Sequence, residues 1–204
     1  ISLVELCDRL PLALAIVAER AQRAGTLSQV VQALTDEMDG LATFGNGTDD
    51  DLTAALSWSY RTLEPMAAAM FRKLGLHPAN DISLDAAAVL ADVPVAQAKQ
   101  ALDQLVDAHM VEQRRANRYE LHDLIRLYAN DEAHRTESLA EIDAAVRRVL
   151  DWYLHGACNA DRHMAPMRRR DFIAPYTPVV DPPQFTDQAD ALAWFELEFD
   201  NLCA

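Results

Sequence analysis

Residues 121–129 spell Leu-His-Asp-Leu-Ile-Arg-Leu-Tyr-Ala, and a helix is predicted to begin inside this stretch and to run over 123–134. Before it, residues 110–114 and 118–121 are predicted to pair as the two strands of a hairpin. The tight turn between these strands falls at Ala116-Asn117. A small β-ribbon followed at once by a helix is therefore expected in the middle of the chain.

Helical segments are predicted on the N-terminal side of this hairpin. One follows Pro65 and ends at Gly75. Ser83 is expected to cap a short helix that reaches Leu90, and a longer helix is predicted from Val95 onward. Because helices followed by a two-stranded ribbon make a winged helix, the predicted fold class is mainly α. It comprises a helical-bundle remnant, a winged-helix domain with a small β-hairpin, and a helical arm.

Apolar residues recur every three or four positions in each expected helix, and this recurrence predicts which side of the helix faces the core. The expected core faces are Met66, Met70, Phe71 and Leu74; Val95, Ala98, Leu102, Leu105, Val106 and His109; Leu124, Leu127 and Tyr128; Ile142, Val146, Val149, Leu150, Tyr153, Leu154 and Ala157; and Leu192, Phe195, Phe199 and Leu202. Trp194 and Leu197 fall outside the last stripe, so that helix is expected to need a further partner.

The clearest linker is Gly40–Asp51, which contains Gly45-Asn46-Gly47 and three consecutive aspartates. It divides the chain into domains. We expect a helical-domain remnant over 1–47, a winged-helix domain over 48–135, and a helical linker leading to repeats over 136–204.

Composition narrows the possible functions. Half of the 204 residues are apolar, which is enough for a folded core. The formal net charge is −14, and when the chain is divided into three successive parts, none of them has a net positive charge. Because non-specific affinity for nucleic acid comes mostly from Lys and Arg, DNA binding by this chain alone is not expected. The three cysteines fit neither a disulfide framework nor a metal site. No membrane span or signal peptide is predicted, so a cytoplasmic location is expected.

Four stretches carry a resemblance to a known family. They are Cys7–Leu14 with its Leu-Pro-Leu-Ala core, Leu74–Pro78, Leu121–Ala129 with its His-Asp pair, and Leu150–Leu154. In this order they resemble the C-terminal half of an NB-ARC or STAND-type switch ATPase. The resemblance is closest to the actinobacterial antibiotic-pathway regulators that join such a switch to a DNA-binding domain and tetratricopeptide-like repeats.

The resemblance implies a site that senses bound nucleotide in the intact protein. By position, Pro11 would pack against the adenine and His122 would reach the β-phosphate of ADP. The contact between His122 and the phosphate would hold the protein in its inactive form. Leu12 and Asp123 would give structural support. An imidazole can donate a charge-assisted hydrogen bond to a phosphate. A carboxylate at a helix start can orient the preceding loop.

The resemblance also implies partners and excludes catalysis by this chain alone. No glycine-rich phosphate loop is present, so the chain is not expected to be an enzyme or to hold ADP or ATP by itself. An upstream nucleotide-binding domain and downstream helical repeats are the expected partners. Because the chain begins at Ile1 and Ala204 follows an apolar helical run, we expect it to continue at both ends. Two positions depart from the family pattern: Arg9 replaces a glycine and Leu121 a methionine.

Two other functions stay open, a DNA-binding winged helix and a passive helical scaffold. The helix from Val95 turns glutamines and aspartates outward, and the aspartates would repel DNA phosphates. Arg114, Arg115 and Arg118 on the wing could instead touch a phosphate backbone. For His122 the alternative to a sensor is a helix-capping or merely exposed histidine.

Two further motifs are interpreted without a function. Residues Asp131–His134 match a helicase tetrapeptide by coincidence, because they lie on an amphipathic helix without a phosphate loop. No metal site is expected, since nothing brings His122, Asp131 and His134 to one point. The Arg168–Arg170 run is expected to form local ion pairs or to stay solvated.

Overall fold

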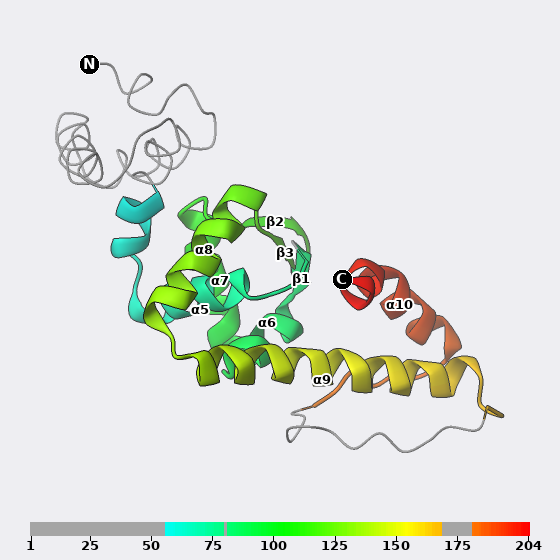
Figure 1. Ribbon diagram of the computed structural model, residues 1–204. Coiled ribbons are helices and arrows are strands. Elements are labelled where there is room, and N and C mark those ends of the chain that lie inside the picture. Colours follow the sequence, from blue (N-terminus) through cyan, green and yellow to red (C-terminus); the bar gives the residue numbers. More distant parts are fainter. Residues whose placement is uncertain (1–55, 80, 169–180) are drawn as a thin grey trace.

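The computed structural model describes residues 56–79, 81–168 and 181–204 (Figure 1). These residues are mainly helical with one small antiparallel sheet, which confirms the predicted fold class. The elements are α5 (Pro65–Gly75), β1 (Asp81–Ser83), α6 (Leu84–Ala91), α7 (Val95–Asp107), β2 (Glu112–Arg115), β3 (Arg118–Glu120), α8 (Asp123–Thr136), α9 (Leu139–Met164) and α10 (Gln188–Cys203). The predicted helical remnant over 1–47, with Pro11 and Leu12, and the Gly40–Asp51 linker lie outside the described residues.

The order from α5 to β3 is that of a winged helix. The sheet has the order β1-β3-β2, with Ile82 opposite Tyr119 in one antiparallel pair and Gln113 opposite Tyr119 in the other. The turn of the predicted hairpin is confirmed, and Asn117 adopts a left-handed backbone there, with φ 58°. Strand β1 was not predicted, because three residues are too few to show a strand period.

Local sequence signals set several helix ends as expected. Pro65 begins α5, which ends at Gly75, and the Ser83 hydroxyl accepts a hydrogen bond from the Ala86 N–H at 3.3 Å to start α6. At the start of α9, Ser138 and Glu141 form a capping box that was not predicted.

Helix α8 packs closely on α5, and this contact orients the start of α8. A Cβ atom on Gly75 would lie 2.4 Å from the Asn130 backbone nitrogen, so only glycine fits at this crossing. The Asn130 side chain also donates to the Gly75 carbonyl at 3.0 Å. The two helices are therefore held in one register.

The prediction of which face of α8 is buried is wrong. Leu124 and Leu127 are 47% and 61% exposed, and of the predicted face Tyr128 alone is buried. The buried side is Ile125, Tyr128, Ala129 and Ala133. Small alanines face α5 because the backbones approach so closely at Gly75 that larger side chains do not fit between them.

The predicted faces of the other helices need similar corrections at their edges. Met66 and Val95 are exposed because each lies in the first turn of its helix, and His109 lies after the end of α7 with φ 54°. On α9, Leu150 and Leu154 are exposed. The inward face there is made by Ala145, Val149, Trp152, Tyr153, Gly156 and Ala160.

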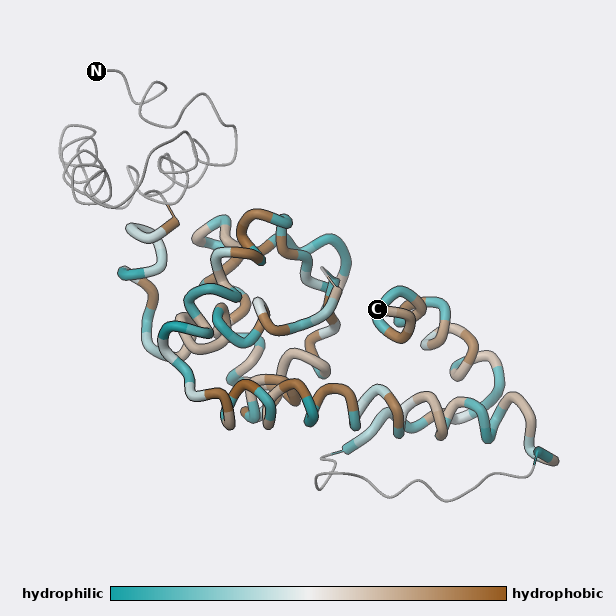
Figure 2. The backbone as a smooth tube through the Cα atoms, viewed as in Figure 1, coloured by the Kyte–Doolittle hydropathy of each residue, from teal (hydrophilic) through white to brown (hydrophobic). Residues whose placement is uncertain are grey.

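The long helix α9 carries two different contacts along its length (Figures 1 and 2). Its N-terminal half packs on α6, where Arg148 donates to the carbonyls of Val89 and Leu90 at 3.2 and 3.1 Å. Its C-terminal half carries α10. A Cβ on Gly156 would lie 2.9 Å from the Trp194 ring, so the indole is seated directly on the α9 backbone.

Helix α10 is rotated relative to the prediction. Trp194, expected off the buried stripe, packs toward α9 with its ring centroid 6.4 Å from that of Trp152. Leu192 and Phe199, expected on the stripe, are exposed. The rotation follows from the size of the indole, which buries more apolar area against the notch at Gly156 than a leucine would.

Candidate functional site

His122 lies at the junction of β3 and α8. Leu121 before it is buried, which anchors the end of the strand, and the His122 carbonyl accepts a hydrogen bond from the Arg126 N–H at 2.9 Å. The backbone of His122 is thus held by the first turn of α8. Its position is set by the packing of α8 on α5 rather than by a loose loop.

The His122 ring itself is exposed. It stands at the N-cap position with extended backbone, yet its side chain accepts no hydrogen bond from the helix N–H groups. The helix-capping interpretation is therefore wrong. An exposed imidazole at this position fits both a sensor, which must be open to a group from outside the winged helix, and a merely exposed histidine.

Asp123 follows in the first turn of α8 and is also exposed. A negative side chain is stabilised there by the positive end of the helix dipole. The structure therefore places His122 and Asp123 together at one helix start. Pro11 and Leu12, the other two predicted site residues, lie outside the described ranges.

Arg126 is a neighbour of this site that the sequence did not indicate. It lies one helical turn after His122, and one of its terminal nitrogens reaches the carbonyls of His77 and Pro78 at 3.4 and 3.5 Å. Its Nε is buried and has no hydrogen-bond partner among the described residues. Arg126 thus ties the start of α8 to the loop after α5.

His77 is the buried histidine of that loop, with 2% of its surface exposed. Its Nδ1 lies 2.9 Å from the Ala79 carbonyl and its Nε2 lies 3.1 Å from the Tyr153 hydroxyl. Burial lowers the pKa of His77 and outweighs the opposing hydrogen bond to Ala79. Because a carbonyl can only accept, Nδ1 carries the proton of the neutral ring and Nε2 accepts from Tyr153.

Tyr153 extends this polar contact into α9. Burial raises the pKa of its phenol, and the nearby carboxylate of Glu198 raises it further. The phenol is therefore neutral over the whole physiological range. The sequence contained the signal for His77 in the Leu74–Pro78 stretch, but the partner on α9 is 76 positions away and could not be inferred from it.

The arginines of the wing are mostly engaged within the protein. Arg114 pairs with Glu112 and Glu120 at 3.1 and 2.8 Å. Arg118, which the sequence placed among possible DNA contacts, is buried and bonded to Asp81 and Glu198. That expectation was wrong for Arg118, because its side chain points from β3 toward α10.

The remaining motifs have local structural roles. His134 donates from Nδ1 to the Asn130 carbonyl at 2.9 Å, an interaction within α8. Arg168 pairs with Asp161 at 2.9 Å, as expected for a local ion pair, whereas Arg169 and Arg170 lie outside the described residues. No group of three or more metal-ligating side chains converges within the ranges 56–79, 81–168 and 181–204. Nor does any helix in that part of the chain have the length and hydropathy to cross a bilayer.

Comparison with known proteins gives two strong matches. The chain is 37% identical over 211 residues to the regulatory protein AfsR of Streptomyces coelicolor, and 37% identical over 208 residues to AfsR of Streptomyces griseus. Each match covers the whole chain and 21% of the relative. No family model and no solved structure matches. The chain is therefore homologous, over its full length, to a stretch of about one fifth of these regulatory proteins.

Proposed function

We propose that this chain is a regulatory module of a nucleotide-operated switch in a transcriptional regulator, of the NB-ARC or STAND type. In this proposal the winged helix senses whether ADP or ATP is bound in the intact protein. The observation that carries it is the exposed His122 ring on a rigidly held helix start. The similarity to two proteins named as regulatory supports the regulatory part of the proposal.

The residues present fit a diphosphate at this point. The positive end of the α8 dipole lies at this helix start and favours an anion. The His122 imidazole next to it can donate a hydrogen bond to a phosphate oxygen. ADP would supply those acceptor oxygens, and residues outside this chain would hold the rest of the nucleotide.

The packing of α8 explains how a contact between His122 and a phosphate would control the position of the whole winged helix. Gly75 and Asn130 hold α8 on α5 in one register, so the start of α8 cannot shift far without the winged helix. Losing the contact at His122 would therefore free the winged helix as a body. Hinge motion of a rigid domain is a common way in which a local contact controls a larger change.

The test compares His122→Ala with His134→Ala in the intact protein. His134 is an exposed histidine of the same helix, so its replacement controls for the loss of an imidazole. We expect His122→Ala to release ADP faster and to raise basal regulatory output, with His134→Ala unchanged. Unchanged ADP retention and unchanged output in His122→Ala would refute the sensor role.

Titration of ADP into the intact protein, with Pro11→Ala and His122→Ala variants, separates the switch from a passive scaffold. In a switch both variants would weaken ADP binding, whereas in a passive scaffold neither would alter it. The DNA-binding alternative has less support, because the outward face of α7 is acidic and Lys99 there is already paired with Asp103. Electrophoretic retardation of a duplex by this chain at low salt would favour that alternative instead.

A further inference from the structure

Arg118 connects the winged helix to the helical arm. From β3, its guanidinium donates to Asp81 on β1 at 2.5 Å and to Glu198 on α10 at 2.5 Å. It also donates to the Leu197 carbonyl on α10 at 3.0 Å. One side chain of the wing is therefore bonded to both a strand of its own sheet and the last helix of the arm.

The two carboxylates differ in their exposure to water. The Glu198 side chain is 3% exposed, whereas the Asp81 side chain is 46% exposed. The second oxygen of Glu198 accepts from the Asn201 side chain at 2.5 Å. Because the Glu198 side chain is almost fully buried, loss of Arg118 would leave its carboxylate without its charged partner inside the protein, which costs more than the same loss at the half-exposed Asp81.

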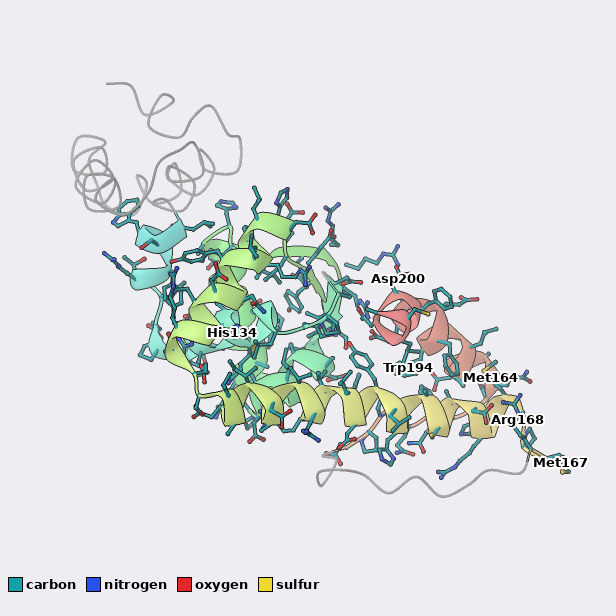
Figure 3. The ribbon with its side chains drawn as sticks, viewed as in Figure 1. His134, Met164, Met167, Arg168, Trp194 and Asp200 are labelled. Carbon is teal, nitrogen blue, oxygen red and sulfur yellow. The ribbon has the colours of Figure 1, made fainter. Side chains whose placement is uncertain are left out.

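Hollows lie on both sides of this ion pair. One, of about 900 Å³, lies between α6, the hairpin turn, α9 and α10, and a second, of about 630 Å³, lies beside β2 and the end of α10. Arg118 and Leu197 line both. The wing and the arm therefore meet at the ion pair with open space around it, while α10 packs along α9 through Trp194 (Figure 3).

We propose that Arg118 and Glu198 form a latch that fixes α10, the last helix of the arm, to the wing. With the latch closed, α10 and the wing move as one body. With the latch open, α10 stays packed on α9 but leaves the wing, and the two hollows merge. A buried ion pair suits this role because its bonds are directional and hold one alignment, unlike apolar contacts.

The latch also adjoins the polar contacts that lead toward His122. Glu198 lies close enough to Tyr153 to influence its phenol, and Tyr153 is hydrogen-bonded to His77 in the loop that Arg126 holds. Helix α10 is thus linked, through Tyr153 and His77, to the loop beside the start of α8. The latch does not depend on what His122 binds, so it stands or falls separately from the proposed nucleotide sensing.

Hydrogen exchange in the intact protein tests the latch. Glu198→Gln keeps the size of the side chain and removes its charge, and Asp200→Asn makes the same change at an exposed position two residues away on α10. We expect exchange in α10 and in the β2–β3 hairpin to become about tenfold faster in Glu198→Gln. Exchange in α5 and α8 should not change, and Asp200→Asn should behave as the parent.

Two results would overturn the latch. One is parental exchange of α10 in a folded Glu198→Gln protein, and the other is equal acceleration in α5, α8 and α10, which would mean that the pair merely supports the whole fold. If Glu198→Gln does not fold, Arg118→Lys decides the matter. A lysine keeps the positive charge but lacks the planar fork with which Arg118 reaches Asp81, Leu197 and Glu198 together, so the same selective acceleration is expected.

Discussion

The Nε2 atom of His77 lies 3.1 Å from the hydroxyl of Tyr153, and this hydrogen bond ties the loop after α5 to the middle of α9. The rings of the two residues also pack in a tilted arrangement, with their centroids 5.9 Å apart and their planes at 52°. The winged helix and the arm therefore share a buried polar contact in addition to the ion pair of Arg118. Its strength depends on His77 remaining neutral.

Acid should weaken the fold through His77. Its pKa is lowered by burial in the folded state, from an ordinary value of 6.5, so the unfolded chain binds the proton more readily. The contribution is complete above pH 6.5 and falls as the pH drops from there toward the folded-state pKa. Urea unfolding of the parent should therefore show a decline in free energy on mild acidification that is smaller in His77→Gln.

Replacement of the exposed His134 by glutamine is the control for this measurement. It should leave the decline unchanged. A His77→Gln protein with the same pH dependence as the parent would contradict the assignment of a buried neutral imidazole.

The two tight glycines should respond differently to a methyl group. In Gly75→Ala the new Cβ meets the α8 backbone at 2.4 Å, whereas in Gly156→Ala it meets the edge of the Trp194 ring at 2.9 Å. Backbone cannot move without shifting the whole helix, but a ring at the surface of the arm can tilt. We expect Gly75→Ala to lower the unfolding free energy by roughly 2–3 kcal/mol and Gly156→Ala to lower it less. Denaturant unfolding decides the order, and the reverse order would count against the close α5–α8 crossing.

The corrected face of α8 can be checked with two truncations. Ile125→Ala removes a buried side chain and should cost about 2–4 kcal/mol, whereas Leu127→Ala removes an exposed one and should change stability by under about 0.5 kcal/mol. The same denaturant measurement applies. A larger loss of unfolding free energy in Leu127→Ala than in Ile125→Ala would mean that the face predicted from the apolar periodicity is the buried one.

Glu137 should be important at the junction of α8 and α9. It accepts from Arg72 at 2.8 Å and Lys73 at 2.9 Å; burial raises its pKa, but these two bonds outweigh burial, and the net pKa is lowered. Its contribution is therefore present at neutral pH and lost as pH falls through the folded-state pKa. Glu137→Gln should destabilise the protein by about 1–2 kcal/mol at neutral pH.

Asp143→Asn is the matched control for Glu137. It removes an exposed pairing with Arg147 one turn away, and such pairs contribute little. Equal losses for the two variants, measured by thermal or urea unfolding, would show that burial of the Glu137 cluster adds nothing.

The candidate site was predictable where its signals are local. The His-Asp pair after a hairpin marks a helix start, and the structure confirms that α8 begins at Asp123, with His122 exposed before it. The neighbours Arg126 and His77 were not predictable as a pair. They are 49 positions apart, and they meet only because α8 crosses α5 at Gly75.

The order of elements and most of their ends could be derived from short-range chemistry: Pro65, Gly75 and Ser83 act on neighbouring backbone groups within one helical turn. Which side of each helix is buried depended on contacts between distant residues. Close backbone approach at Gly75 turned Leu124 and Leu127 outward, and the notch at Gly156 turned Trp194 inward. Arg118, apparently a surface cation, became buried because α10 folds back and brings Glu198 to it. Caps and turns are local and visible in a sequence, whereas burial is a property of the assembled pair of surfaces.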